Sequence, residues 1–223
     1  SDKLLPSFML RYGITDDLIA RVSYGETIRQ PGFAQLNPTI TYVEDVTNIG
    51  YGTAGGGNPN LKPTESKNYD LSLEWYFDEG NAIYGALFKR DIEGFVVDFR
   101  RRVTHVNNDG DPYDFILTQP DNASNGELKG YELGFIYFPK DLPEVLDGMG
   151  VQASYTSLDS SQDIPITNTA GEVTGTTTTP LFGVSDSSYS VVLAYEKERF
   201  DMRLSYVWRE DFLNNYEAAL FAN

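Results

Sequence analysis

The sequence predicts an all-β protein whose strands belong to an antiparallel transmembrane β-barrel. Three observations predict this class. Apolar and polar side chains alternate along about eight separate runs, short and long connections alternate between those runs, and aromatic residues gather near the ends of the apolar stripes. Alternation with a period of two indicates a strand whose two faces meet different surroundings.

The runs follow one another along the whole chain. The first two cover residues 8–14 and 18–27, and Asp16-Asp17 between them has the length of a hairpin turn. The remaining runs cover residues 69–77, 82–103, 131–137, 151–156, 189–195 and 200–208. In the clearest run, Leu71, Leu73 and Trp75 share one face.

The connections alternate in length. Short ones are expected near residues 15–17, 78–81, 140–150 and 197–199, and long ones near 29–66, 104–126 and 164–187. Outer-membrane barrels have short turns on one side and long extracellular loops on the other. The lengths therefore favour such a barrel.

Aromatic residues cluster near the ends of the apolar stripes. Rings with an apolar body and a polar tip collect at membrane–water boundaries, so we predict two aromatic girdles. The residues concerned are Tyr12, Tyr24, Tyr69, Trp75, Phe77, Tyr131, Tyr137, Tyr189, Tyr195, Phe200 and Trp208.

Two alternatives stay open at this point. One is a complete eight-stranded barrel that acts as a passive channel or an adhesion scaffold, because eight strands can close around a core of side chains. The other is a soluble carbohydrate-binding β-sandwich, which would have to bury the stripe of Leu71, Leu73 and Trp75.

Composition excludes several classes of partner and site. The 223 residues carry a formal charge of −16, which argues against nucleic acid because phosphate binding needs clustered Lys and Arg. Cysteine is absent, so the chain has no disulfide and no thiolate metal site. No run of 18 apolar residues occurs that could form a transmembrane helix.

The sequence predicts no catalytic, cofactor or metal site, and we expect the protein not to be an enzyme. His105, the single histidine, lies in a polar segment that we interpret as a surface loop without a nucleophile elbow. The acidic segment 107–114 lacks the ligand spacing of a calcium loop and is interpreted as a solvated turn. Residues 167–179, rich in Thr and Gly, are expected to form a mobile loop.

Four segments carry a resemblance to a known family. Residues 27–38 (TIRQPGFAQLNP) are followed by residues 57–66 (GNPNLKPTES), then by 86–95 (ALFKRDIEGF) and 125–132 (NGELKGYE). In order and spacing they resemble TonB-dependent outer-membrane receptors, in detail most closely the branch typified by Xanthomonas and Caulobacter.

Local chemistry explains part of these motifs. Pro59 and Pro63 hold the chain extended and remove amide donors, so their segment is expected to end a loop. Gly55, Gly56 and Gly57 are expected to supply turning freedom. Gly130 is expected where a strand bends or packs closely.

The resemblance implies a function. Such receptors import scarce bulky nutrients across the outer membrane of Gram-negative bacteria through a 22-stranded barrel filled by an N-terminal plug. The inner-membrane TonB complex supplies the energy through a short box ahead of the plug. On this reading residues 1–223 are a segment of the barrel, with the plug, the TonB box and the final strands outside it.

The resemblance also implies partners: outer-membrane lipid, the protein's own plug, the TonB complex and a nutrient. An oligosaccharide is favoured as the nutrient, and an iron chelate such as a siderophore is the alternative. Inward-facing charges are expected to line a wet lumen and to pair with plug residues or with water: Arg21, Glu74, Glu132, Arg203 and Arg209. Loop aromatics that could contact the nutrient are Phe33, Tyr42, Tyr51 and Tyr113.

Overall fold

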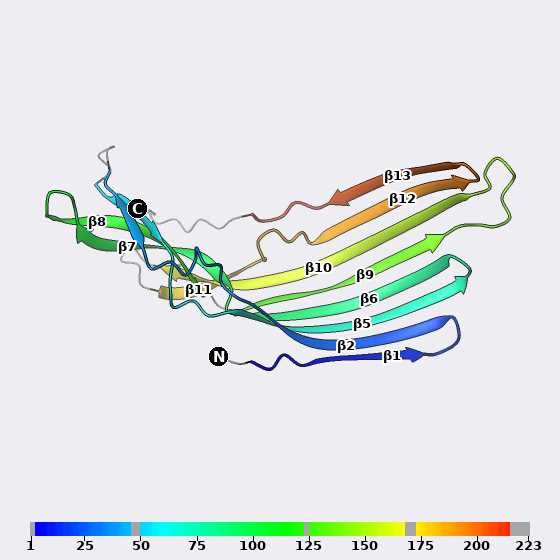
Figure 1. The fold of residues 1–223 in the computed structure, drawn as a ribbon, viewed down its shortest axis with the longest axis horizontal. Helices are drawn as coiled ribbons and strands as arrows, with labels where there is room; N and C mark the ends of the chain where they lie inside the picture. Colours follow the sequence, from blue (N-terminus) through cyan, green and yellow to red (C-terminus); the bar gives the residue numbers. More distant parts are fainter. Residues whose placement is uncertain (1–2, 46–49, 123–124, 168–172, 215–223) are drawn as a thin grey trace.

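The computed structural model describes residues 3–45, 50–122, 125–167 and 173–214. These residues form two β-sheets joined end to end (Figure 1). The described ranges contain no helix, and therefore none of the length and apolarity that a membrane span requires.

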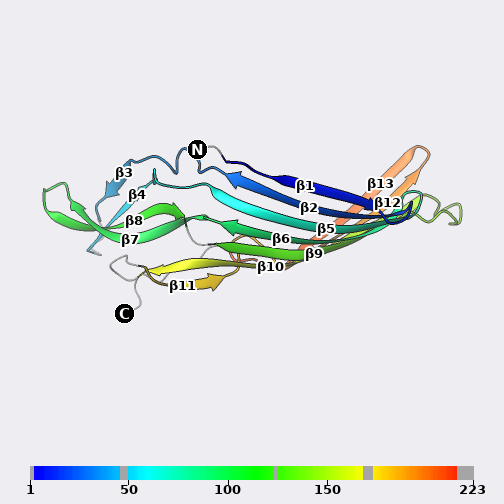
Figure 2. The same ribbon diagram turned by 90° about the horizontal axis from the view of Figure 1, so that it is seen from below.

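The larger sheet, called here the wall sheet, is one curved layer of antiparallel strands (Figures 1 and 2). Its spatial order is β1–β2–β5–β6–β9–β10–β12–β13. The bounds are β1 (Ser7–Gly13), β2 (Leu18–Arg29), β5 (Thr64–Asp78), β6 (Asn81–Glu93), β9 (Gly126–Tyr137), β10 (Met149–Thr167), β12 (Ser187–Lys197) and β13 (Phe200–Arg209). Among the described strands β1 and β13 are the two edges, so these strands do not close into a small barrel.

The smaller sheet, called here the loop sheet, has the order β3–β4–β8–β7 and lies at the end of the wall opposite the hairpin turns (Figure 1). Its strands are β3 (Ile40–Val43), β4 (Gly52–Gly56), β7 (Val96–Val106) and β8 (Pro112–Asn122). The β4–β8 pair is parallel, whereas every other described pair is antiparallel. A further strand, β11 (Val173–Thr179), pairs with the far half of β10.

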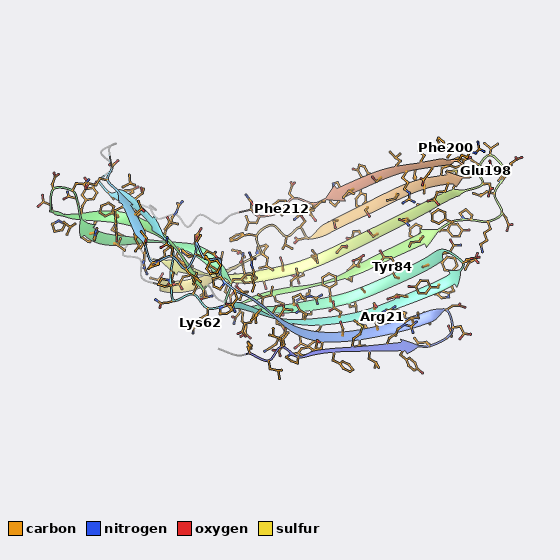
Figure 3. All side chains as sticks on the ribbon, viewed as in Figure 1. Arg21, Lys62, Tyr84, Glu198, Phe200 and Phe212 are labelled. Atoms are coloured by element: carbon orange, nitrogen blue, oxygen red, sulfur yellow. The ribbon has the colours of Figure 1, made fainter. Side chains whose placement is uncertain are left out.

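Seven of the eight alternating runs, and the first part of the run 82–103, are confirmed as strands of the wall sheet, and the short connections lie together at one end of this sheet (Figure 1). Two of these connections illustrate how the turns are held. Lys140 of the β9–β10 connection lies 2.8 Å from Asp78 of the β5–β6 turn, and this hydrogen bond raises the pKa of Lys140. Glu198 turns the β12–β13 hairpin with a φ of 47° (Figure 3).

Two predictions are wrong, one about a strand and one about a loop. The run 82–103 is not one strand, because Gly94 takes a φ of +72° after β6 and Val96 begins β7 in the other sheet. The segment 167–179 is not simply a loop. Its residues 173–179 form β11, where threonines suit an extended backbone, and residues 168–172 lie outside the described part.

The apolar stripe of the wall is exposed. Leu71, Leu73 and Trp75 keep 46%, 47% and 49% of their surface. A β-sandwich would bury them against a second sheet, so the sandwich alternative is wrong. A wall that faces lipid leaves this stripe uncovered by protein.

The aromatic residues form the two predicted rows on the outer face. Opposed residues of antiparallel strands share a face, which places these rings together. On the loop side, ring centroids lie 5.1 Å apart for Tyr24–Tyr69, 6.1 Å for Tyr131–Tyr155 and 5.3 Å for Tyr189–Trp208. On the turn side they lie 5.2 Å apart for Trp75–Phe77 and 5.9 Å for Tyr195–Phe200.

The expected inward charges have partners within the wall itself. Arg21 makes two hydrogen bonds to Glu74, of 2.8 and 3.2 Å (Figure 3). The other three charged residues also have partners on a neighbouring strand or its extension. Glu132 accepts a hydrogen bond of 3.3 Å from Tyr84, Arg203 donates one of 2.8 Å to Glu196, and Arg209 donates one of 2.6 Å to Ser185. The inner face therefore carries its own polar network.

Candidate functional site

The loop sheet has a small core of its own. Phe115 and Leu117 keep only 1% and 2% of their surface, and Ala54 of β4 packs beside them. The rings of Tyr113 and Tyr42 meet Phe115 edge-on at 5.3 and 5.0 Å. Alternation along β8 places its apolar residues on one face, so the long connections fold into a packed unit instead of separate loops.

The proline-rich motif fastens this unit to the wall. Asn122 at the end of β8 accepts a hydrogen bond of 2.7 Å from the Lys62 amide and donates one of 2.9 Å to the Lys62 carbonyl. The Asn122 amide also donates to the carbonyl of Gly94, at 2.9 Å. Lys62 lies where the two sheets meet (Figure 3). The prediction that this motif ends a loop is confirmed, because β5 begins at Thr64.

A second set of contacts ties the motif to the segment before β3. Gln119 donates a hydrogen bond of 2.6 Å to the Gly57 carbonyl, and the Asn58 amide donates one of 2.6 Å to the Gln35 carbonyl. A Cβ on Gly57 would lie 2.5 Å from that same oxygen of Gln35. Close approach therefore requires glycine at position 57, and the expected turning freedom is wrong there because the backbone keeps a negative φ.

These contacts frame a cleft of about 470 Å³ on the loop sheet, lined by both polar and apolar groups. Its volume lies in the range of small-molecule sites. Amide and hydroxyl side chains, glycine backbone and one carboxylate line it: Ala34, Gln35, Asn37, Thr39, Thr41, Gly55, Gly56, Gly57, Asp98 and Pro120. A Cβ on Gly55 would meet nothing within 4 Å, so the cleft is open at this backbone.

Two side chains of the cleft are held by local hydrogen bonds. Gln35 accepts a bond of 2.9 Å from the Gly32 amide, and Asn37 accepts one of 3.0 Å from the Thr39 amide. Both bonds use the amide oxygen of the side chain, so each NH₂ group faces elsewhere with two donors. The cleft is thus lined by donors and acceptors in fixed positions.

Both signs of charge lie on the face of the cleft. Arg100 and Arg102 follow Asp98 in β7 at two-residue steps, which places the three side chains on one face of the strand. Arg102 lies 3.7 Å from Asp114 of β8.

The four aromatic residues singled out from the sequence do not form one cluster. Phe33 is 95% exposed, whereas Tyr113 and Tyr42 pack around the small core. Tyr51 precedes β4 and is half-buried. Contact of these residues with a ligand stays a prediction.

His105 does not lie in a loop, and that expectation is wrong. It is in β7, where its ring stacks on Tyr42 with centroids 4.1 Å apart. Of the acidic segment 107–114, residues 107–111 form the predicted turn, in which Asn107 accepts bonds of 3.1 and 2.8 Å from the Asp109 and Asp111 amides, but residues 112–114 already belong to β8. Within the described residues, no group of three His, Cys, Asp or Glu side chains could hold a metal ion.

Sequence reasoning missed most of the cleft. Gln35 and Asn37 belong to the segment that carries the resemblance, but nothing there marks them as site residues. Thr41 and Asp98 lie far apart in the chain and line the same cleft because β3 pairs with β4, β4 with β8 and β8 with β7. A prediction of strand pairing across the long connections could have found them.

Comparison with known proteins gives one family and many similar structures. A family model described as TonB dependent receptor-like, beta-barrel, matches residues 1–220. No curated protein matches the chain.

This chain spans about a third of the length of three similar solved structures. The siderophore receptor PirA from Pseudomonas aeruginosa is 18% identical with a TM-score of 0.59. The ferric enterobactin receptor PfeA from Pseudomonas aeruginosa, a mutant in complex with enterobactin, is 16% identical with a TM-score of 0.63, and PirA from Acinetobacter baumannii is 14% identical with 0.64. The matches cover 90%, 92% and 98% of this chain but only 32%, 28% and 31% of those chains, and at such identities they show the fold alone.

Proposed function

Since this chain belongs to the TonB-dependent receptor-like β-barrel family, we propose that it forms part of a receptor that imports a bulky nutrient across the outer membrane of a Gram-negative bacterium. The cleft on the loop sheet carries the proposal, because it lies on the side that long extracellular loops define in such barrels. The receptor is a transporter and not an enzyme.

An oligosaccharide is the ligand that the cleft itself favours. Sugar hydroxyls both donate and accept hydrogen bonds, and the cleft offers amides, hydroxyls and the Asp98 carboxylate. Phe33 beside the cleft segment is almost fully exposed and would supply an apolar face for a sugar ring. Membership of the Xanthomonas and Caulobacter branch, which we also propose, would favour the same ligand class.

A ferric chelate is the second candidate. Arg100 and Arg102 lie on the face that carries the cleft, and guanidinium groups bind anionic oxygens well. The similar structures include siderophore receptors, which supports this alternative. The two ligand classes would use different charges of β7. An oligosaccharide would bind the Asp98 carboxylate, whereas a ferric chelate would bind the guanidinium groups of Arg100 and Arg102.

The proposed partners follow from the family. We propose that the barrel of which this chain is part surrounds a plug and that the TonB complex pulls on a box ahead of the plug. A barrel of 22 strands would leak without such a plug.

The full-length receptor provides the test. Ligand binding is measured by calorimetry on purified receptor, with a panel of neutral oligosaccharides and a panel of ferric chelates, for Asp98→Asn and for the double variant Arg100→Gln with Arg102→Gln. An oligosaccharide receptor is expected to lose about tenfold in affinity in Asp98→Asn, since a hydrogen bond to a charged group contributes about 1.5–3 kcal/mol. The double variant should then bind the sugar normally.

Growth of a receptor-deletion strain gives the second readout. Oligosaccharide-dependent growth that fails without the receptor and without TonB supports the favoured ligand. Binding of ferric chelates alone, weakened by the arginine double variant, would establish the alternative. Growth that is independent of TonB would overturn the proposal of energised import.

A further inference from the structure

The connection between β9 and β10 is the longest of the short connections at the turn end of the wall. It covers residues 138–148, whereas the others cover residues 14–17, 79–80 and 198–199. In both views of the ribbon it projects beyond the other turns (Figures 1 and 2). A hairpin between neighbouring antiparallel strands needs only about two to five residues, so closing the hairpin does not explain the additional length.

The middle of this connection is wound into one ordered turn. The amides of Leu146 and Asp147 donate hydrogen bonds of 2.7 and 2.9 Å to the Pro143 carbonyl. Gly148 then takes a φ of +91°, and a Cβ at this position would collide with the carbonyl oxygen of Glu196. Glycine is therefore required where the end of the turn closes against β12.

The turn has an apolar side and an acidic side. At about 100° per residue, Val145 and Leu146 lie on one side of a helical turn, and Glu144 and Asp147 lie on the other. Val145 is 80% exposed and Leu146 is 44% exposed, so the described part of the protein leaves the apolar side largely uncovered. Such a two-sided segment suits a boundary between an apolar and an aqueous medium.

Two outward-facing side chains of β12 hold the turn in place. The Tyr195 hydroxyl donates a hydrogen bond of 3.2 Å to the Val145 carbonyl, and the Lys197 ammonium donates one to the Glu144 carbonyl. Tyr195 belongs to the aromatic row on the turn side, and Lys197 is the next outward position of the strand. The turn therefore lies on the outer side of the wall, directly beyond that row.

We propose that residues 143–147, held by Tyr195, insert Val145 and Leu146 into the headgroup region of the periplasmic leaflet and so anchor this end of the wall. Short turns define the periplasmic side of such barrels, and the aromatic row marks the edge of the hydrocarbon. The headgroup layer beyond that edge is about 5–8 Å thick on each side of the bilayer.

Lipid is favoured over a protein partner because the apolar side of the turn continues the lipid-facing surface of the wall. An amphipathic segment in the headgroup layer buries its apolar side and keeps its charged side in water. The carboxylate of Asp147 on the acidic side lies 4.0 Å from the Lys197 ammonium, which offsets part of its charge. The inference rests on the outer-membrane location within the proposed function, but not on the imported nutrient.

Spin labels on the full-length receptor in phospholipid vesicles test the placement of the turn. Residues 1–223 contain no cysteine, so single labels are attached through Val145→Cys, Leu146→Cys or Glu144→Cys in a receptor without other cysteines. Molecular oxygen concentrates in lipid, whereas a nickel chelate stays in water. Labels at positions 145 and 146 are expected to collide mainly with oxygen, and the label at position 144 mainly with the nickel chelate.

Two further labels supply the controls. Glu79→Cys lies in the β5–β6 turn at the same end, where the side chain is 94% exposed, and should collide mainly with the nickel chelate. The same behaviour at positions 145 and 146 would overturn the proposal. Protection of both positions from both reagents would also overturn it, because a protein would then cover the turn. With Leu133→Cys in lipid, water exposure at 145 refutes the anchor alone, whereas water exposure at both refutes the outer-membrane location.

The hydroxyl of Tyr195 gives an independent arm. Tyr195→Phe removes the hydrogen bond to the Val145 carbonyl and keeps the ring in its row, so the label at position 145 should become more mobile and lose part of its preference for oxygen. Tyr137→Phe, which changes a tyrosine of β9 that stacks on Phe77 in the same row, is the matched control and should leave the label unchanged. Equal behaviour of the two variants would overturn the role of Tyr195 in holding the anchor.

Discussion

The wall sheet and the loop sheet use apolar residues in opposite ways. In the wall, Leu71 and Leu133 keep about half of their surface although they are the most regular apolar positions of their strands. In the loop sheet, Phe115 and Leu117 keep almost none. The same alternation of side chains therefore ends in two kinds of burial within one chain.

The difference follows from the surroundings of each sheet. A wall strand gains stability when lipid covers its apolar face, so protein contacts on that face are unnecessary. The loop sheet stands beyond the aromatic girdle in water, where apolar side chains must bury one another. Because the core of the loop sheet contains no wall residue, the two units should fail separately.

The largest expected effect is in the loop sheet. Phe115→Ala empties the centre of its core and is expected to cost about 3–5 kcal/mol, as for other buried Phe residues. Hydrogen exchange on the full-length receptor should show loss of protection in β7 and β8 with the wall strands unchanged. Loss of protection in both sheets together would contradict their independence.

Introducing a charged residue on the outer face of the wall sheet tests whether that face meets lipid. Leu133→Arg is expected to cost about 2–4 kcal/mol in a bilayer, because a cation near the midplane is poorly solvated. Gln152→Arg, on the inner face of β10, is the matched control and should cost little. Guanidinium unfolding of the receptor in lipid vesicles measures both. Equal costs would show that the outer face does not meet lipid.

The junction between the two units should respond next. Asn122→Ala removes three hydrogen bonds to the backbone of Lys62 and Gly94, and leaves those groups without this partner. The expected cost is about 1–3 kcal/mol. Faster exchange of the Lys62 amide, with the core of the loop sheet still protected, is the expected observation. Asn60→Ala, an exposed residue of the same motif, is the control.

The smallest expected effect on stability is at Phe33. Because its side chain is 95% exposed, Phe33→Ala should change the free energy of unfolding by less than about 0.5 kcal/mol. Ligand affinity is the sensitive measurement. A clear loss of affinity at unchanged stability would confirm the predicted contact, and an unchanged affinity would remove Phe33 from the site.

The sequence determined the wall by itself. Period-two alternation, hairpin-length turns and terminal aromatics depend on neighbours within one strand or one turn, so seven of the eight runs, and the first part of the run 82–103, were placed correctly without any structure. The resemblance to the receptor family was also visible in the order of four segments, and the family match over residues 1–220 confirms it.

Only the tertiary structure decided what the long connections do. At Gly94 the chain leaves β6 and then enters β7 in the other sheet, and nothing local in the run 82–103 shows that change. The parallel pairing of β4 with β8 brings Gly55 beside Thr118, 63 residues along the chain. The cleft and the anchoring role of Asn122 depend on such distant pairings, because each is an arrangement of side chains from strands that local sequence patterns describe one at a time.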